Sequence, residues 1–384
     1  MFWHVMVYSR GLESAYSHPY AVHLFTSSKP SPNEAFRMAE EILSKTFPDW
    51  GKDKREYLAY VGYEELPLSL PPEAEGSYVA VKFLISMRVE NAQFISTVPP
   101  TLVSILEKYR MEKLTLDYDG KDDHTKADII DVLDTLLEKN ISFKIYETHR
   151  GYHIRASLPQ PLPLEEILKM RKGFGDDNAR LDVDSHYLHH GFGFLTNLLF
   201  NEKYWWDFPR DNLQCTIETE INPKKIMIEF KQFISFTLPE ISINIPSKGI
   251  IEVKGSEVVF KGSFGLKEMR RIVQSIEDNL WEYAYAQRSQ SNMINSLIAS
   301  YRKISPTLST ALERCKISFS DGVIVIHVPE NLSPLVGRLI GKQGQNIRAV
   351  EAELGIKIRI SQSSPPPEDV EMKRKLQDLL GRVV

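Results

Sequence analysis

The chain has 384 residues, of which 42% are hydrophobic and 26% are charged, and its formal net charge at pH 7 is −4. This composition is typical of a soluble globular protein, and the length predicts two or three domains, each with its own core. The negative net charge excludes a protein that coats nucleic acid by bulk electrostatic attraction, so any such binding must use a local basic surface.

The cysteines and the N-terminal residues bear on the cellular compartment. Cys215 and Cys315 lie far apart and form no Cys-x-x-Cys motif, so neither a structural zinc site nor a disulfide framework is predicted. The N-terminal segment lacks the charged-then-apolar profile of a signal peptide, and no apolar run reaches the roughly 18 residues that span a bilayer. We therefore expect a cytoplasmic protein without a membrane partner.

In chain order, residues 1–75 predict an N-terminal α/β segment with a helix over residues 33–46 and a proline-rich loop over residues 66–72. The next predicted segment begins with a strand over residues 78–87. A helix is expected over residues 101–109, because two prolines precede it and prolines are common at the first turn of helices.

A β-α-β unit follows. Residues 113–118 and 141–146 predict strands, and residues 127–139 predict a helix between them with one apolar face and several aspartates on the other. The side chains expected to be buried in this helix are Ile130, Leu133, Leu136 and Leu137.

After this unit, the pattern predicts a helix over residues 164–171 and a third strand over residues 180–184. Residues 211–290 predict a strand-rich segment that ends in a helix. Residues 291–313 predict a connecting helix, and residues 361–384 predict a Ser/Pro tether followed by a short helix.

The most informative motif lies near the C-terminus. An apolar run leads into Gly341-Lys342-Gln343-Gly344, an amphipathic helix is predicted over residues 346–354, and an alternating strand is predicted over residues 356–360. Two glycines around two polar residues allow the backbone to approach a nucleic-acid strand closely. The N–H groups that begin the following helix, together with Lys342, would then face the phosphates.

This arrangement resembles a KH domain covering residues 314–360. A helix–turn–helix punctuated by glycines is the alternative interpretation, because a lone Gly-x-x-Gly is weak evidence. The resemblance implies binding of single-stranded RNA or DNA, with contacts from Arg338, Ile340, Gly341, Lys342, Gln343, Gly344 and Arg348. The basic excess of the module is small, so it predicts no tight non-specific binding.

Candidate catalytic residues lie in the β-α-β region. Asp117 and Asp119 are two apart at the end of a predicted strand, so they project from the same face and either bind a divalent cation or repel each other. A third carboxylate, Asp182 or Asp184, comes from the strand predicted over residues 180–184. Three such carboxylates can hold two Mg²⁺ or Mn²⁺ ions for nucleotidyl transfer, although Asp-x-Asp is also common in solvated turns.

The order of these motifs, over residues 76–210, resembles the archaeo-eukaryotic primase superfamily, the fold of the small catalytic primase subunit and of primase-polymerases. Leu116-Asp117-Tyr118-Asp119 matches its first motif, and Leu181-Asp182 matches its third. Arg150-Gly151-Tyr152-His153 matches the second, although the serine expected upstream is replaced by Glu147-Thr148.

The resemblance implies an α+β protein: a primase-like core (RRM-like β-α-β), a strand-rich middle segment and a C-terminal KH domain. It implies that Asp117, Asp119 and Asp182 are catalytic ligands of Mg²⁺ or Mn²⁺. The residues implied to bind a nucleoside triphosphate are Arg150, His153 and Lys203. The sequence departs from the family near Lys203, because the expected arginine is missing and His189 and His190 stand earlier than expected.

Two functions follow from these observations. The first is a primase-polymerase-like nucleotidyltransferase that acts on single-stranded nucleic acid by a two-metal mechanism. The second is a catalytically inactive, primase-like RNA-binding protein that acts with a partner subunit, in a ribonucleoprotein or in a replication complex. The aromatic run at residues 204–208 suits stacking on bases, but a core or interdomain contact is the stronger interpretation.

Overall fold

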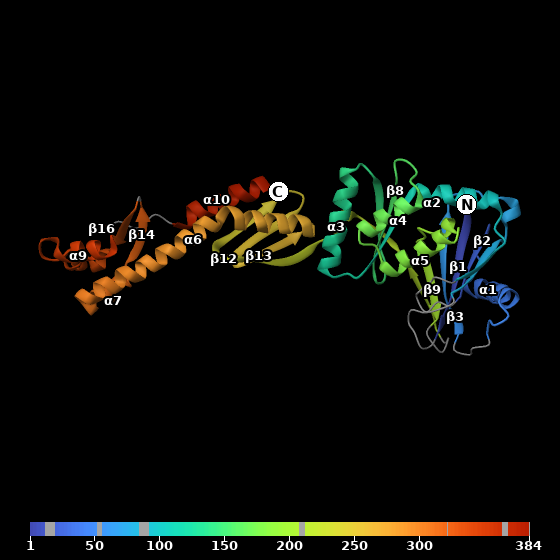
Figure 1. Ribbon diagram of the computed structural model, residues 1–384, viewed down its shortest axis with the longest axis horizontal. Helices are drawn as coiled ribbons and strands as arrows, with labels where there is room; N and C mark the ends of the chain where they lie inside the picture. Colours follow the sequence, from blue (N-terminus) through green and yellow to red (C-terminus); the bar gives the residue numbers. More distant parts are fainter. Residues whose placement is uncertain are drawn as a thin grey trace. The chain divides into compact units, whose positions relative to one another are not determined.

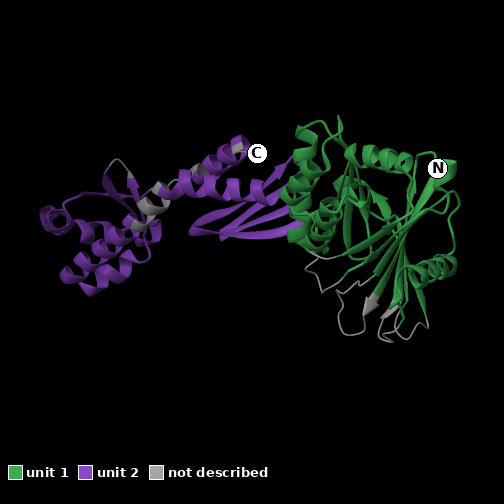
Figure 2. Ribbon diagram, turned by 45° about the vertical axis from the view of Figure 1, so that its right-hand side comes forward, with its two compact units in different colours: residues 1–227 green, residues 228–384 purple. Residues whose placement is uncertain are grey.

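The computed structural model divides into two compact units, residues 1–227 and residues 228–384 (Figure 2). The residues that the structure describes are 1–11, 20–51, 56–83, 92–206, 212–320, 322–362 and 368–383. Both units contain helices and strands (Figure 1). No helix among these residues is long and apolar enough to cross a membrane.

A seven-stranded sheet in the first unit has the strand order β10-β9-β3-β1-β2-β4-β5. Its strands are β1 (Phe2–Gly11), β2 (Tyr20–Thr26), β3 (Glu56–Leu66), β4 (Tyr78–Lys82), β5 (Gln93–Ser96), β9 (Glu202–Trp206) and β10 (Leu213–Ile217). Because β4 pairs with β2 and β10 pairs with β9, this sheet joins segments on both sides of the boundaries expected near residues 75 and 210.

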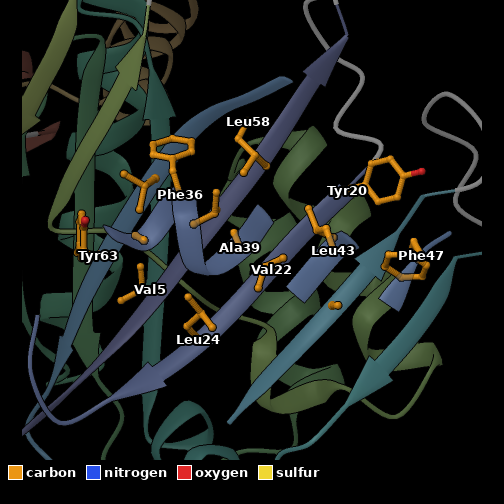
Figure 3. Close-up of a cluster of buried hydrophobic side chains, with 14 residues drawn as sticks. Val5, Tyr20, Val22, Leu24, Phe36, Ala39, Leu43, Phe47, Leu58 and Tyr63 are labelled. Atoms are coloured by element: carbon orange, nitrogen blue, oxygen red, sulfur yellow. The ribbon is translucent and has the colours of Figure 1, made fainter. Parts of the chain in front are cut away.

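Helices cover both faces of this sheet. Helix α1 (Pro32–Thr46) begins at a capping box between Ser31 and Glu34 and packs against alternate residues of β1 and β2 (Figure 3). The opposite residues of these strands pack with α2 (Pro100–Met111) and with Tyr187 of α5 (Asn178–His189). The alternation along β1 and β2 therefore buries both faces of the sheet.

A four-stranded sheet has the order β11-β7-β8-β6 and contains the predicted β-α-β unit. Its elements are β6 (Lys113–Asp119), α3 (Asp123–Glu138), β7 (Ser142–Glu147), β8 (Gly151–Ser157) and β11 (Thr219–Ile221), with α4 (Leu164–Gly173) after β8. Ile130, Leu133 and Leu136 are buried as predicted, but the prediction for Leu137 is wrong, because its side chain is 61% exposed.

The prediction of a strand over residues 180–184 is wrong, since these residues belong to helix α5. Asp177 caps the helix by accepting a hydrogen bond from the backbone N–H of Arg180 (2.7 Å). Leu181, Asp184 and Tyr187 are buried at three-residue spacing, which is helical rather than strand-like. The alternation of charged and apolar residues from 180 to 184 is too short to distinguish the two periods.

The second unit begins with a long hairpin, β12 (Ile228–Ile245) and β13 (Gly249–Gly262), followed by α6 (Leu266–Ile304) and α7 (Pro306–Leu312). The strand-rich segment predicted over residues 211–290 contains these two long strands. The helix predicted at its end continues as α6 into the helix predicted over residues 291–313, and α7 forms the rest of that prediction. Helix α6 ends at Ile304, and Ser305 is extended, because Pro306 disfavours a helical conformation in the residue before it.

A three-stranded sheet completes the second unit, with the order β14-β15-β16 and a parallel pairing of β15 with β16. Its elements are β14 (Lys316–Ser320), β15 (Val323–His327), α8 (Pro334–Ile340), α9 (Gln345–Leu354) and β16 (Lys357–Ser361), and helix α10 (Glu368–Val383) follows. The short 3₁₀ helices of the chain are η1 (Pro72–Ala74), η2 (Gly193–Leu195), η3 (Pro223–Lys225), η4 (Glu330–Leu332) and η5 (Lys342–Gly344). The tether predicted at residues 363–367 lies outside the described residues.

Candidate nucleic-acid interface and carboxylate site

The loop between α8 and α9 has a backbone that most side chains disfavour. Gly341, Gln343 and Gly344 have φ angles of 74°, 55° and 78°. A Cβ atom on Gly341 would lie 2.6 Å from Cγ and 2.9 Å from the backbone nitrogen of Asn346, so this position requires glycine. The loop therefore brings bare backbone to the surface beside the start of α9.

Basic groups surround this loop. Arg338, Lys342 and Arg348 are exposed, and no ion pair involves Lys342 within the described part of the chain. Arg338 donates to Oγ1 of Thr307 (2.7 Å), and Arg348 donates to the carbonyl oxygen of Gln343 (2.5 Å). No side chain caps the N-terminus of α9 among the described residues. Helix N–H groups and basic side chains thus converge on one surface that suits an anion.

The loop rests on the core of this module. Leu339 is buried, whereas the next residue, Ile340, keeps 37% of its surface exposed and offers an apolar patch beside the loop. The hydroxyl of Tyr301 on α6 donates to the carbonyl oxygen of Leu339 (3.3 Å), and burial raises the pKa of Tyr301 to about 12. Helix α6 is therefore part of the scaffold that positions the loop.

The structure brings Asp117 and His153 together in the four-stranded sheet. They face each other as cross-strand partners on β6 and β8, and Nε2 of His153 lies 3.2 Å from Oδ1 of Asp117. Burial alone would raise the pKa of Asp117, but the hydrogen bond and charge of His153 exceed that effect, with help from Lys203 and Arg180. The pKa of Asp117 is consequently well below its usual range.

Asp119 lies at the exposed end of β6 and has different surroundings. Partial burial of its carboxylate is the largest cause that raises its pKa, and the negative charges of Asp117 and Asp177 raise it further. The positive charges of Arg150 and Lys203 lower it. The structure thus places Arg150 and Lys203, two of the predicted triphosphate-binding residues, in electrostatic range of the carboxylate pair.

Asp182 has a different setting from the one predicted. It lies exposed on helix α5, whereas its neighbour Asp184 is buried in an ion pair with Arg171. Within the described residues, no group of three or more histidine, cysteine, aspartate or glutamate side chains is placed to hold a metal ion. A role for Asp182 as third ligand stays a prediction.

Several polar residues of this site were not found from the sequence. Glu218 accepts a hydrogen bond from Nδ1 of His153 (2.9 Å) and pairs with Arg155, so the imidazole lies between two carboxylates. Asp176 is buried, accepts a hydrogen bond from the backbone N–H of Asp117 (2.6 Å), and pairs with Arg171 (2.7 Å). Glu218 and Asp176 are far from His153 and Asp117 in sequence, so only the tertiary fold identifies them.

Two further features lie near this sheet. The predicted packing of the aromatic run is confirmed for Tyr204 and Trp206, which pack against the core beside α1, and residues 207–211 lie outside the described part. An open hollow of about 370 Å³ lies beside the β7–β8 turn. It is lined by Glu147, Thr148, His149, Cys215, Thr216, Ile217 and Thr219, and it is separate from Asp117, Asp119 and His153.

Residues 323–376 match the family model of the KH domain. The match begins at β15, and the structure adds β14, which pairs with β15 in the same sheet. No curated protein and no solved structure matches the chain. The primase-like core stays a prediction from the motifs. The C-terminal part of this protein contains a KH domain, which indicates binding to nucleic acid.

Proposed function

We propose that this protein binds single-stranded RNA or DNA through the loop from Gly341 to Gly344. The observation that carries the proposal is the geometry of that loop, in which three residues have positive φ and the exposed Lys342 has no ion-pair partner among the described residues. A phosphate group would meet the N–H groups at the start of α9 and the ammonium group of Lys342. Ile340 would contact a base or sugar.

The test is oligonucleotide binding by the variant Lys342→Asp/Gln343→Asp, measured by fluorescence anisotropy with labelled single-stranded RNA and DNA. Both side chains are exposed, and aspartate tolerates the positive φ of residue 343, so the fold should persist. We expect affinity to fall at least about tenfold, because two carboxylates would repel the phosphates.

A matched control is Asn222→Asp/Lys225→Asp, which makes the same change in net charge on exposed residues of the first unit. Aspartate can replace Asn222 as the cap of η3. The control should bind like the wild type. Equal loss in both variants would assign binding to overall charge, and no loss in the loop variant would place the contact elsewhere.

We propose nucleotidyl transfer at the carboxylate pair as a second function. Support comes from the convergence of Asp117 and Asp119 with His153 and with the cationic groups of Arg150 and Lys203. The two carboxylates would hold a Mg²⁺ or Mn²⁺ ion, which would offset the desolvation and the repulsion from Asp117 that raise the pKa of Asp119. Such an ion supplies activation of a hydroxyl group and stabilisation of a leaving pyrophosphate.

In this proposal, Glu218 orients His153, while Arg150 and Lys203 bind the triphosphate. The test is extension of a single-stranded template, with and without primer, using labelled nucleotides and Mn²⁺. Synthesis should disappear in Asp117→Asn/Asp119→Asn and persist in the loop variant at high template concentration. Failure of synthesis in the wild type, with intact oligonucleotide binding, would favour the inactive RNA-binding protein of a larger complex.

A further inference from the structure

A cluster of histidines at the C-terminal end of α5 is separate from both sites described above. His186 and His189 belong to the last turn of the helix, and His190 follows as its C-terminal cap. The rings of His186 and His190 have centroids 4.4 Å apart, and those of His189 and His190 are 5.2 Å apart. Residues four apart share one face of a helix, so the helix geometry places His186 next to His190.

His186 carries an unexplained buried nitrogen. The residue is only 8% exposed, and its Nε2 atom is buried without a hydrogen-bond partner among the described protein atoms. Buried polar atoms of native proteins are almost always paired, so an orphaned ring nitrogen points to a missing ligand.

A hydrogen bond to the backbone of His186 fixes the tautomer of His190. Nδ1 of His190 lies 3.2 Å from the carbonyl oxygen of His186. Because a carbonyl oxygen can only accept, Nδ1 must carry the proton, which leaves the lone pair on Nε2. Histidines that bind metals commonly donate their other ring N–H to a backbone carbonyl in this way.

The surroundings favour a cation. The cluster lies at the C-terminal end of α5, where the helix dipole is negative. On one side, the rings of Phe94 and Phe192 stack at 4.4 Å, and Phe94 lies 5.2 Å from His190. Aromatic rings thus line one side of His190.

We propose that His186 and His190 form a two-imidazole site for a divalent transition-metal cation such as Zn²⁺. Neutral imidazole is a preferred ligand for Zn²⁺, Ni²⁺ and Cu²⁺, and poor for Mg²⁺. The protein supplies two nitrogens, so the remaining coordination positions belong to solvent or to a ligand from outside the chain.

The test is a titration of the full chain, stripped of metal by a chelator, with Zn²⁺ in a calorimeter. We expect one equivalent to bind at these imidazoles, and His190→Gln should weaken the binding of that equivalent at least about tenfold. His149→Gln, which changes an exposed histidine elsewhere, and Asp117→Asn/Asp119→Asn should keep this equivalent. Unchanged binding in His190→Gln, or loss in the carboxylate variant instead, would overturn the proposal.

A second measurement needs no variant. In long-range ¹H–¹⁵N spectra of the imidazole rings of wild-type protein, Zn²⁺ should shift the Nε2 signals of two histidines, because the lone pair of each Nε2 atom becomes a metal ligand. No change in any buried histidine signal would show that Nε2 of His186 has no metal and would overturn the site. Because this readout is on the native fold, it is independent of any effect of His190→Gln on stability.

Discussion

Asp117 and Asp119 differ in their effect on stability although they share one face of β6. The pKa of Asp117 is lowered, so its contribution to stability is present above the ordinary pKa of aspartate, about 4, and is lost as pH falls through its folded pKa. The pKa of Asp119 is raised, so its ionised carboxylate destabilises the fold above its folded pKa, and this penalty disappears as pH falls to the ordinary pKa of aspartate.

Single asparagine substitutions should therefore have opposite effects on the free energy of unfolding at pH 7 in the presence of EDTA. Asp117→Asn should lower it by about 1–3 kcal/mol, because His153 loses an ionised partner. Asp119→Asn should raise it by up to about 1 kcal/mol, the range for partly exposed charges, and that gain should vanish near pH 3. Urea denaturation at both pH values measures this, and equal signs at pH 7 would contradict it.

Gly151 is required for close packing rather than for flexibility. It pairs with Asp119 across β6 and β8, and a Cβ atom would overlap the carbonyl oxygen of Tyr118 and lie 2.8 Å from its carbonyl carbon. Gly151→Ala should destabilise the protein by about 2–3 kcal/mol, because backbone atoms would have to move. Gly173→Ala is the control: its Cβ would meet no atom within 4 Å, so thermal unfolding should show no loss of stability.

At the scale of elements, periodic segments were predictable from the sequence. The β-α-β unit and α9 follow from apolar spacing over several turns or strand residues. Helix α5 was not predictable as a helix, because only five residues with an ambiguous pattern suggested its structure. In the carboxylate site, the proximity of Asp117 and His153 was predictable from motifs. The position of Glu218 beside His153 was not, because it depends on strand pairing between distant segments.

Helix α6 should be indispensable to the KH domain. Leu297 and Tyr301 of α6, with Leu308 and Leu312 of α7, are buried in the same core as the sheet of this domain. Burying four such side chains contributes about 6–12 kcal/mol, which is comparable to the whole stability of a small domain. A fragment of residues 314–362 lacks them, although it contains the whole three-stranded sheet.

We therefore expect a fragment of residues 291–362 to fold cooperatively and the shorter fragment of residues 314–362 to be unfolded. Far-UV circular dichroism and the dispersion of amide NMR signals distinguish the two states. In the longer fragment, Tyr301→Phe should cost about 1 kcal/mol, through loss of the hydrogen bond to Leu339. A folded 314–362 fragment would show that α6 only connects the domain to the hairpin.

At the scale of the whole molecule, the formal net charge of −4 limits how nucleic acid can be bound. Because the chain as a whole repels phosphates, binding must come from attraction to local basic groups. Three exposed basic residues surround the loop: Arg338, Lys342 and Arg348. Each phosphate neutralised on a single strand contributes about −0.7 to the slope of log K against log salt concentration. Three contacts predict a slope of about −2.

Anisotropy titrations between about 50 and 200 mM salt should give this shallow slope. Lys342→Ala should make the slope less negative by about 0.7, because one phosphate contact is lost. Lys225→Ala, which removes an equal charge from the exposed η3 turn, should leave the slope unchanged. A slope near −5 in the wild type would require phosphate contacts beyond these three residues. Nucleic acid would then engage basic side chains outside the loop, and Arg150 and Lys203 beside the carboxylate pair would be the first to substitute.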